Sequence, residues 1–146
     1  MSSLEPADVV RAVTDGVSRL IAGGLGPDDQ ERLLDELAAL YAESTDVRHP
    51  FSPDREEPLR TREQLRRHFA AAPAQLTGAE RFEPTGFVTH ETVDPEVVIV
   101  EFSYTGTVNG KPFEIPNIFV VRVRHGEIIE SRDYGDHLAF ARAFGG

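Results

Sequence analysis

The sequence contains no cysteine, so the chain can form no disulfide, no thiolate metal site and no cysteine nucleophile. Long hydrophobic runs are also absent, because no apolar stretch approaches the roughly 18 residues of a membrane-spanning helix. The first five residues lack the positive and apolar regions of a signal peptide. We therefore expect a soluble, cytoplasmic protein with no membrane partner.

Positive charge is scarce relative to negative charge, since 15 Lys and Arg residues stand against 25 Asp and Glu residues, giving a net charge of -10. Affinity for nucleic acid depends on clustered Lys and Arg. Basic residues gather only at 60–67, where acidic residues are interleaved with them, as on a solvated helix face. Nucleic acid is therefore not expected as a partner.

Signatures of metal and cofactor sites are missing as well. The five histidines have no paired ligand spacing, so we predict no metal site. The sequence contains no glycine-rich phosphate loop and no serine-nucleophile motif. We therefore expect a protein that works without a cofactor.

The chain has 146 residues, of which 40% are hydrophobic and 27% charged, a composition typical of globular proteins. A domain of this size buries roughly 68–70% of the surface of its unfolded chain, which is enough for one core. We predict one domain that spans residues 1–146.

Helical patterns dominate the first half of the sequence. Apolar residues recur at helical spacing over residues 6–20 and again, after Pro27, up to Tyr41. A short strand is predicted at residues 46–51. Thr61 and Gln64 form a capping box that opens a third helix, which we expect Pro73 to end.

Strand patterns dominate the second half, from about Phe82 onward. Asn109-Gly110 lies between two runs typical of strands, at residues 97–104 and 111–124, and is a strong hairpin signal. A second turn near His125-Gly126 leads into a strand over residues 127–134. Helices followed by strands indicate an α+β fold, with the helices packed on a curved, mainly antiparallel sheet around a cone-shaped pocket.

A two-residue turn at Asn109-Gly110 fixes which residues share the inner face of the sheet. It places Asn117 opposite Phe102, Phe119 opposite Val100, and Ile115 opposite Tyr104. In the second hairpin we expect a three-residue loop at residues 124–126, which pairs Asn117 with Asp133 and Phe119 with Ser131. A two-residue loop there would move Asp133 to the opposite face.

Several short motifs together resemble one family. They are Tyr-Ala-Glu at 41–43, His-Pro-Phe at 49–51, Thr-Arg-Glu at 61–63, and Arg-Asp-Tyr-Gly-Asp at 132–136. The sequence resembles the nuclear transport factor 2-like superfamily, in particular its SnoaL-like and ketosteroid-isomerase-like branch. The resemblance extends from about Val9 to Asp136, and it implies a homodimer.

The resemblance also implies roles for individual residues. His49 falls where ketosteroid isomerases place their carboxylate general base. Asp133 matches the aspartate that acts as acid/base in SnoaL-type polyketide cyclases. The corresponding aspartate of limonene epoxide hydrolases activates water. Phe119 falls where ketosteroid isomerases hold a protonated aspartate as hydrogen-bond donor. Because phenylalanine cannot donate, Asn117 or Tyr104 would have to supply that hydrogen bond.

Each candidate residue also has a structural interpretation. His49 could be a surface histidine at a strand end, and Asp133 could form an ion pair with Arg132. Asn117 and Tyr104 could bond to each other or to water on the inner face. The remaining predicted substrate-binding residues are Phe102, Phe119 and Tyr41, although the place of Tyr41 at the end of an apolar helical stripe favours the core.

Two functional hypotheses follow. The first is a small-molecule enzyme (isomerase, cyclase or dehydratase) in which His49 and Asp133 transfer protons on a lipophilic carbonyl or polyketide-like substrate. The second is a non-catalytic protein of the same fold that binds a small lipophilic ligand or serves in assembly. A homodimer would use the outer sheet face, where Pro116, Ile118 and Val120 lie.

Overall fold

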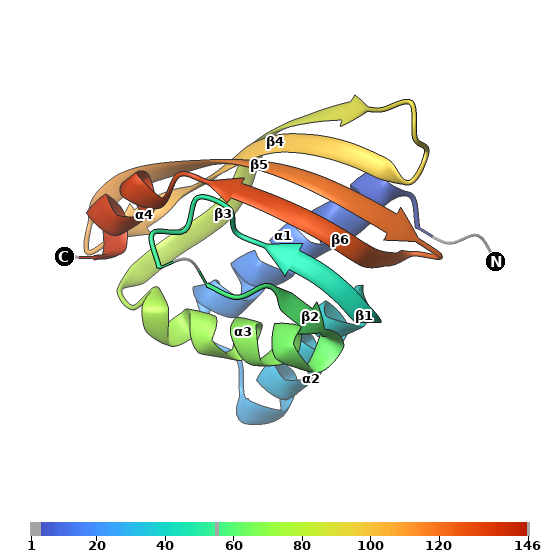
Figure 1. The fold of residues 1–146 in the computed structure, drawn as a ribbon. Helices are drawn as coiled ribbons and strands as arrows, with labels where there is room; N and C mark the ends of the chain where they lie inside the picture. Colours follow the sequence, from blue (N-terminus) through green and yellow to red (C-terminus); the bar gives the residue numbers. More distant parts are fainter. Residues whose placement is uncertain (1–3, 55, 146) are drawn as a thin grey trace.

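The computed structural model describes residues 4–54 and 56–145, in which four helices accompany a curved sheet of six strands (Figure 1). The helices are α1 (Pro6–Ala22), α2 (Pro27–Ala39), α3 (Arg62–Gln75) and α4 (His137–Phe144). The strands are β1 (Tyr41–Arg48), β2 (Leu59–Thr61), β3 (Ala79–Glu91), β4 (Val97–Val108), β5 (Lys111–Arg124) and β6 (Glu127–Gly135). The predicted α+β class is confirmed.

The first two helices begin where the sequence predicts, each with a proline in its first turn. α1 ends at Ala22 and is followed by Gly23, whose φ of 74° few other residues adopt. α2 ends at Ala39, so the prediction that Tyr41 extends the helical stripe is wrong. Tyr41 instead opens β1, and its side chain turns into the core from a strand.

The capping box before α3 is present in part. The Thr61 hydroxyl accepts a hydrogen bond from the backbone N–H of Gln64 at 3.1 Å, and the Gln64 side chain accepts one from the N–H of Arg60 at 2.6 Å. The expectation that Pro73 ends the helix is wrong, because α3 continues through Pro73 to Gln75. Proline lacks only its own N–H donor, and the hydrogen bond that closes the helix, from Leu76 N–H to Ala72 O at 3.1 Å, is present.

The sheet has the strand order β2-β1-β6-β5-β4-β3. β1 runs parallel to β6 and every other neighbouring pair is antiparallel, so the sheet is mainly antiparallel as predicted. The register of the first hairpin is confirmed, with Phe102 opposite Asn117 and Val100 opposite Phe119. β2 was not predicted, and β1 begins five residues before the strand expected at residues 46–51.

The second hairpin differs from the prediction. Its turn holds two residues, His125 and Gly126, both with positive φ, rather than three. A bulge between Arg122 and Val123 then shifts the register by one residue. Phe119 therefore lies opposite Asp133, not Ser131, and Asn117 lies opposite Gly135. The bulge cancels the effect of the shorter turn, and Asp133 stays on the face shared with Asn117 and Phe119.

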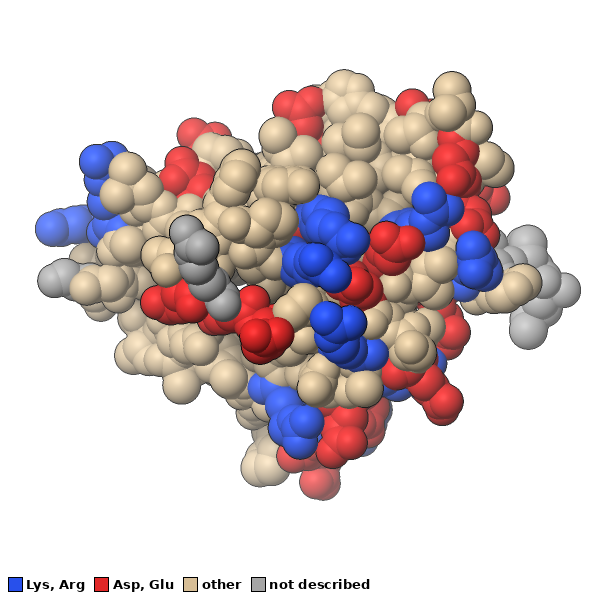
Figure 2. Space-filling view, viewed as in Figure 1, with Lys and Arg blue, Asp and Glu red and all other residues tan. Residues whose placement is uncertain are grey.

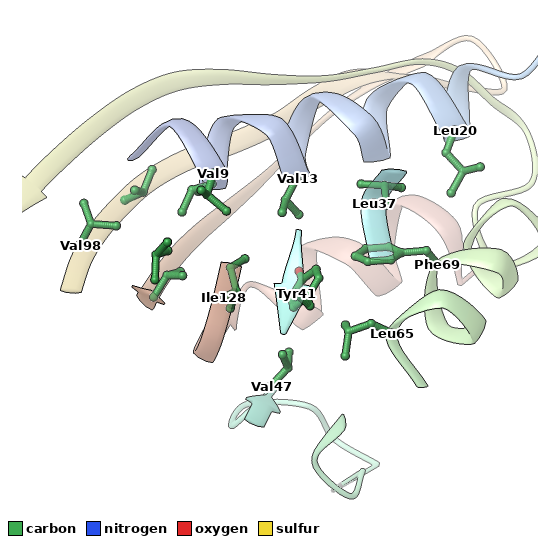
Figure 3. Packing of buried hydrophobic residues seen from close by; sticks show 14 of the residues in the cluster. Val9, Val13, Leu20, Leu37, Tyr41, Val47, Leu65, Phe69, Val98 and Ile128 are labelled. Atoms are coloured by element: carbon green, nitrogen blue, oxygen red, sulfur yellow. The ribbon is translucent and has the colours of Figure 1, made fainter. Parts of the chain in front are cut away.

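The core lies between α1, α2, α3 and the concave face of the sheet (Figure 3). α1 and α2 approach closely at Gly16, where a Cβ atom would lie 2.5 Å from Leu37 Cδ2. Tyr41 and Phe69 pack side by side with ring centroids 5.9 Å apart. Their packing brings β1 and α3 together, and both residues line a cavity.

Charged residues of both signs are interspersed on the face shown in Figure 2. The arginines of α3 illustrate this, because Arg66 pairs with Glu31 and Asp35, and Arg67 pairs with Glu63. This face carries no continuous basic surface. The arrangement agrees with the interpretation of residues 60–67 as a solvated helix face.

Candidate functional site

A cavity of about 480 Å³ opens between the concave face of the sheet and helices α1, α3 and α4. Most of its wall is apolar, with Val13 and Val17 from α1, Leu65 and Phe69 from α3, and Phe140 from α4. The polar groups that reach it include five of the predicted site residues, which are His49, Asp133, Asn117, Tyr104 and Tyr41. An apolar cavity with a few polar groups is typical of a small-molecule site.

His49 and Asp133 lie together in this cavity, although 84 positions separate them in the sequence. His49 follows the last residue of β1, and Asp133 lies on the neighbouring strand β6. His49 Nε2 is 3.6 Å from Asp133 Oδ2, and the two side chains are 21% and 15% exposed. The hydroxyl of Ser131 donates a hydrogen bond to Asp133 Oδ1. Both groups are thus held in place and shielded from bulk water.

Burial shifts the pKa of each member of the pair toward its neutral form. Loss of hydration raises the pKa of Asp133 to about 6, against the smaller lowering effects of Ser131, His68 and Arg132. Burial lowers the pKa of His49; the charge of Glu56 raises it by less, and the nearby His137 lowers it. At pH 7 the pair therefore consists of a carboxylate with raised proton affinity beside a neutral imidazole.

Arg132 does not neutralise Asp133. Neighbouring residues on a strand point to opposite faces, and the Arg132 side chain lies on the outer one. There it pairs with Asp46 at 3.7 Å and with Glu130 at 3.5 Å. The alternative interpretation of Asp133 as the ion-pair partner of Arg132 is therefore wrong.

Two histidines that the sequence analysis did not assign to the site also line the cavity. The ring of His68, on α3, stacks on His49 with centroids 5.4 Å apart, and burial lowers its pKa. The second is His137, at the start of α4. Its Nε2 is buried, and among the described residues this nitrogen has no hydrogen-bond partner.

Helical spacing contained a signal for both histidines. His68 lies three residues after Leu65 and four before Ala72, and therefore on the apolar face of α3. His137, Phe140 and Ala141 share one face of α4 and line the cavity, whereas Leu138 is 60% exposed. The helical spacing of apolar residues, rather than the histidine residue type, would have assigned both histidines to the cavity wall.

The side chains of Tyr104 and Tyr41 line the cavity, and their hydroxyl groups stay protonated. Burial raises the pKa of both phenols, and the charge of Asp133 raises them further. Asn117 uses one amide N–H to bond the carbonyl of Ile115 at 2.8 Å. A Cβ atom on Gly135 would lie 2.9 Å from Asn117 Oδ1, so the glycine leaves room for this amide.

The two phenylalanines predicted to contact substrate have different positions. Phe119 lines the cavity beside Asp133 on the neighbouring strand. Phe102 does not line it, because its ring is enclosed by Phe87, Tyr104 and Phe119 at centroid distances of 5.0 to 5.4 Å. Phe102 thus supports the cavity wall from behind.

Within residues 4–54 and 56–145, no group of three His, Asp or Glu side chains is arranged to hold a metal ion. In the same part of the chain, no helix has both the length and the apolar character needed to cross a membrane.

Comparison with known proteins relates this architecture to one family. The sequence model of the SnoaL-like domain matches residues 30–131. An uncharacterised PhzA/B-like protein from Pseudomonas aeruginosa is 37% identical over 87 residues, which cover 58% of this chain and 59% of the relative. The match thus spans less than two thirds of that relative.

Solved structures show the same fold. A protein with a ketosteroid isomerase-like fold from Catenulispora acidiphila, in complex with trimethylamine, superposes with a TM-score of 0.67 at 20% identity over 94% of this chain and 92% of the other. A protein from Jannaschia sp. CCS1, provisionally named a SnoaL-like polyketide cyclase, gives 0.62 at 19% identity over 100% and 96%. These likenesses show the fold of this chain.

Proposed function

Because the chain belongs to the SnoaL-like family, we propose that it is a small-molecule enzyme that transfers protons on a lipophilic carbonyl or polyketide-like substrate. The reaction is of the isomerase, cyclase or dehydratase type and uses no cofactor. The observation that carries the proposal is the placement of His49 Nε2 3.6 Å from Asp133 Oδ2 in a mostly apolar cavity. A buried pair of proton acceptors is what general acid/base catalysis requires.

In the proposed reaction the His49–Asp133 pair removes a proton from the carbon next to the substrate carbonyl. The electrons of the broken C–H bond move onto the carbonyl oxygen, which becomes an enolate. The pair then returns the proton to another atom of the substrate or product. A pKa of about 6 suits Asp133 to this exchange, because efficient proton transfer needs a group that titrates near the working pH.

The developing enolate needs hydrogen-bond donors, and Phe119 supplies none. The Tyr104 hydroxyl is one proposed donor, since its raised pKa keeps the proton in place. The amide of Asn117 is the other, because only one of its N–H groups is used by the carbonyl of Ile115. Each donor of this kind contributes roughly 10²–10³-fold to a rate when aimed at the developing charge.

Isotope exchange tests the proposal without knowledge of the full reaction. Steroid-like enones and aromatic polyketide mimics are incubated with the protein in D₂O, and the loss of C–H signals is followed by NMR. We expect exchange into one class of compound, and a decrease of about 10²–10⁴-fold in His49→Ala and in Asp133→Asn.

A matched control for these variants is His90→Ala. His90 also pairs with a carboxylate, that of Glu101, but both side chains are 49% exposed and outside the cavity. Exchange in this control should equal that of the wild type. Full activity in both His49→Ala and Asp133→Asn would refute the assignment of the pair.

The outer face of the sheet supports a second role. Pro116 and Ile118 on β5 are exposed, Ile118 to 43%, and Val120 beside them is half-buried. We propose this apolar strip as the surface of a homodimer. A non-catalytic protein that binds a lipophilic ligand or acts in assembly would use the same cavity and the same strip.

A further inference from the structure

The charges around the cavity are of one sign. Three carboxylates line it, those of Asp54, Glu56 and Asp133, whereas none of the described residues that line it is Lys or Arg. Arg48 and Arg132 face a neighbouring groove, and both pair with Asp46. Their charges are therefore already compensated outside the cavity.

The histidines add no compensating charge at neutral pH. Burial lowers the pKa of His49 and of His68, so both imidazoles are neutral at pH 7. Asp133 is the most enclosed of the three carboxylates, with a side chain that is 15% exposed. Together with Asp54 and Glu56, ionised Asp133 makes the potential of the cavity negative, which favours a ligand that brings positive charge.

The rest of the wall suits a cation with an apolar body. The aromatic rings of Phe69, Phe82 and Tyr104 line the cavity, and aromatic faces attract ammonium groups. The buried Nε2 of His137, without a partner among the described residues, is an independent sign that a ligand completes the polar contacts of this wall. An ammonium group donates up to three hydrogen bonds and accepts none.

From these observations we propose that the cavity binds lipophilic compounds carrying a protonated amine in preference to neutral or anionic compounds of the same shape. This inference rests on the proposed function only in placing the substrate in the same cavity. The carbonyl of such a substrate lies beside His49 and Asp133. The ammonium group lies toward Asp54 and Glu56, which are exposed at the mouth.

Three probes with one aromatic body test the preference: 2-naphthylmethylamine, 2-naphthylmethanol and 2-naphthoate. Their dissociation constants are measured by calorimetry at pH 7.5 in 50 mM salt. A cation–π contact together with an ionic contact at the exposed mouth corresponds to about tenfold in affinity. We therefore expect the amine to bind about tenfold more tightly than the alcohol, and the carboxylate to bind most weakly.

Substitutions at the mouth test the source of the preference. In the double variant Asp54→Asn, Glu56→Gln the advantage of the amine over the alcohol should fall to about threefold or less. Glu57→Gln is the control for Glu56→Gln within this pair, because it removes one negative charge from the neighbouring position, which does not line the cavity. It should leave the order and the ratio unchanged.

Three results would overturn the inference: equal or tighter binding of 2-naphthoate, no binding of the amine at millimolar concentration, or an equal effect of the Glu57→Gln control. None of them depends on catalysis. His49→Ala, which should lose isotope exchange, retains all three carboxylates and should keep the order of affinities. Failure of the proposed reaction and failure of the charge preference are therefore distinguishable.

Discussion

Asp133→Asn should stabilise the protein at neutral pH while abolishing its proposed activity. Burial raises the pKa of this carboxyl from its ordinary 3.8 to about 6. Each pKa unit corresponds to about 1.4 kcal/mol, so ionised Asp133 lowers the free energy of unfolding by about 3 kcal/mol above pH 6. Asparagine has nearly the same shape, can accept the hydrogen bond of Ser131, and carries no charge to bury.

The pH dependence of this effect has a definite sign. Between about pH 4 and pH 6 the folded protein holds the Asp133 proton more tightly than the unfolded chain does, so this group makes stability fall as pH rises. His49 and His68 act in the opposite direction, because their pKa values are lowered in the folded state and stability rises as they lose their protons. Subtracting the wild-type curve from the variant curve cancels the desolvation part of the histidine contribution, which is the largest part for both histidines, and leaves Asp133 together with its charge interaction with His68.

Urea unfolding of both proteins at several pH values between 4 and 8 measures the difference. We expect almost none near pH 4, a steady increase to pH 6, and a plateau of about 3 kcal/mol above it. For a chain of this size the plateau corresponds to a midpoint roughly 6–12 °C higher in thermal unfolding. A difference that does not vary with pH, or a variant less stable at pH 7.5, would refute the reasoning.

Two further predictions concern packing and assembly. Gly16→Ala places a Cβ atom 2.5 Å from Leu37 Cδ2, and should lower the free energy of unfolding by about 1–3 kcal/mol in urea titrations; an unchanged midpoint would show that α1 and α2 can separate without cost. Sedimentation at micromolar concentration should show a dimer for the wild type and a monomer for Ile118→Asp, whose charge would lie in the proposed interface; a wild-type monomer would count against the outer face as an interface.

Local signals in the sequence predicted much of the fold. Pro27 and the pattern after it predicted the start of α2, and Asn109-Gly110 fixed the register of the first hairpin. The end of α2 was missed because Leu40 and Tyr41 continue the helical spacing of apolar residues. Tyr41 is buried from the strand β1 instead, so an apolar residue at the right interval was compatible with both structures.

The second hairpin shows what local signals do not contain. Nothing in the sequence around Arg122 and Val123 marks the bulge between them, because a bulge depends on how two whole strands pack. Without the bulge, the two-residue turn at His125-Gly126 would have placed Asp133 on the outer face. The predicted face of Asp133 is thus correct, although the predicted turn and the predicted partner of Asp133 are wrong.

The environment of Asp133 separates a functional role from a structural one. A carboxylate kept for stability would be expected to have a cationic partner, yet Arg132 points to the opposite face and pairs with Asp46 and Glu130. His49 beside it is neutral at pH 7, so Asp133 lowers stability when it ionises. If Asp133→Asn both stabilises the protein and stops isotope exchange, the loss of stability caused by ionised Asp133 is explained by its role in the reaction. If it stabilises the protein and leaves exchange intact, the base must be sought among the other groups of the cavity, beginning with His68.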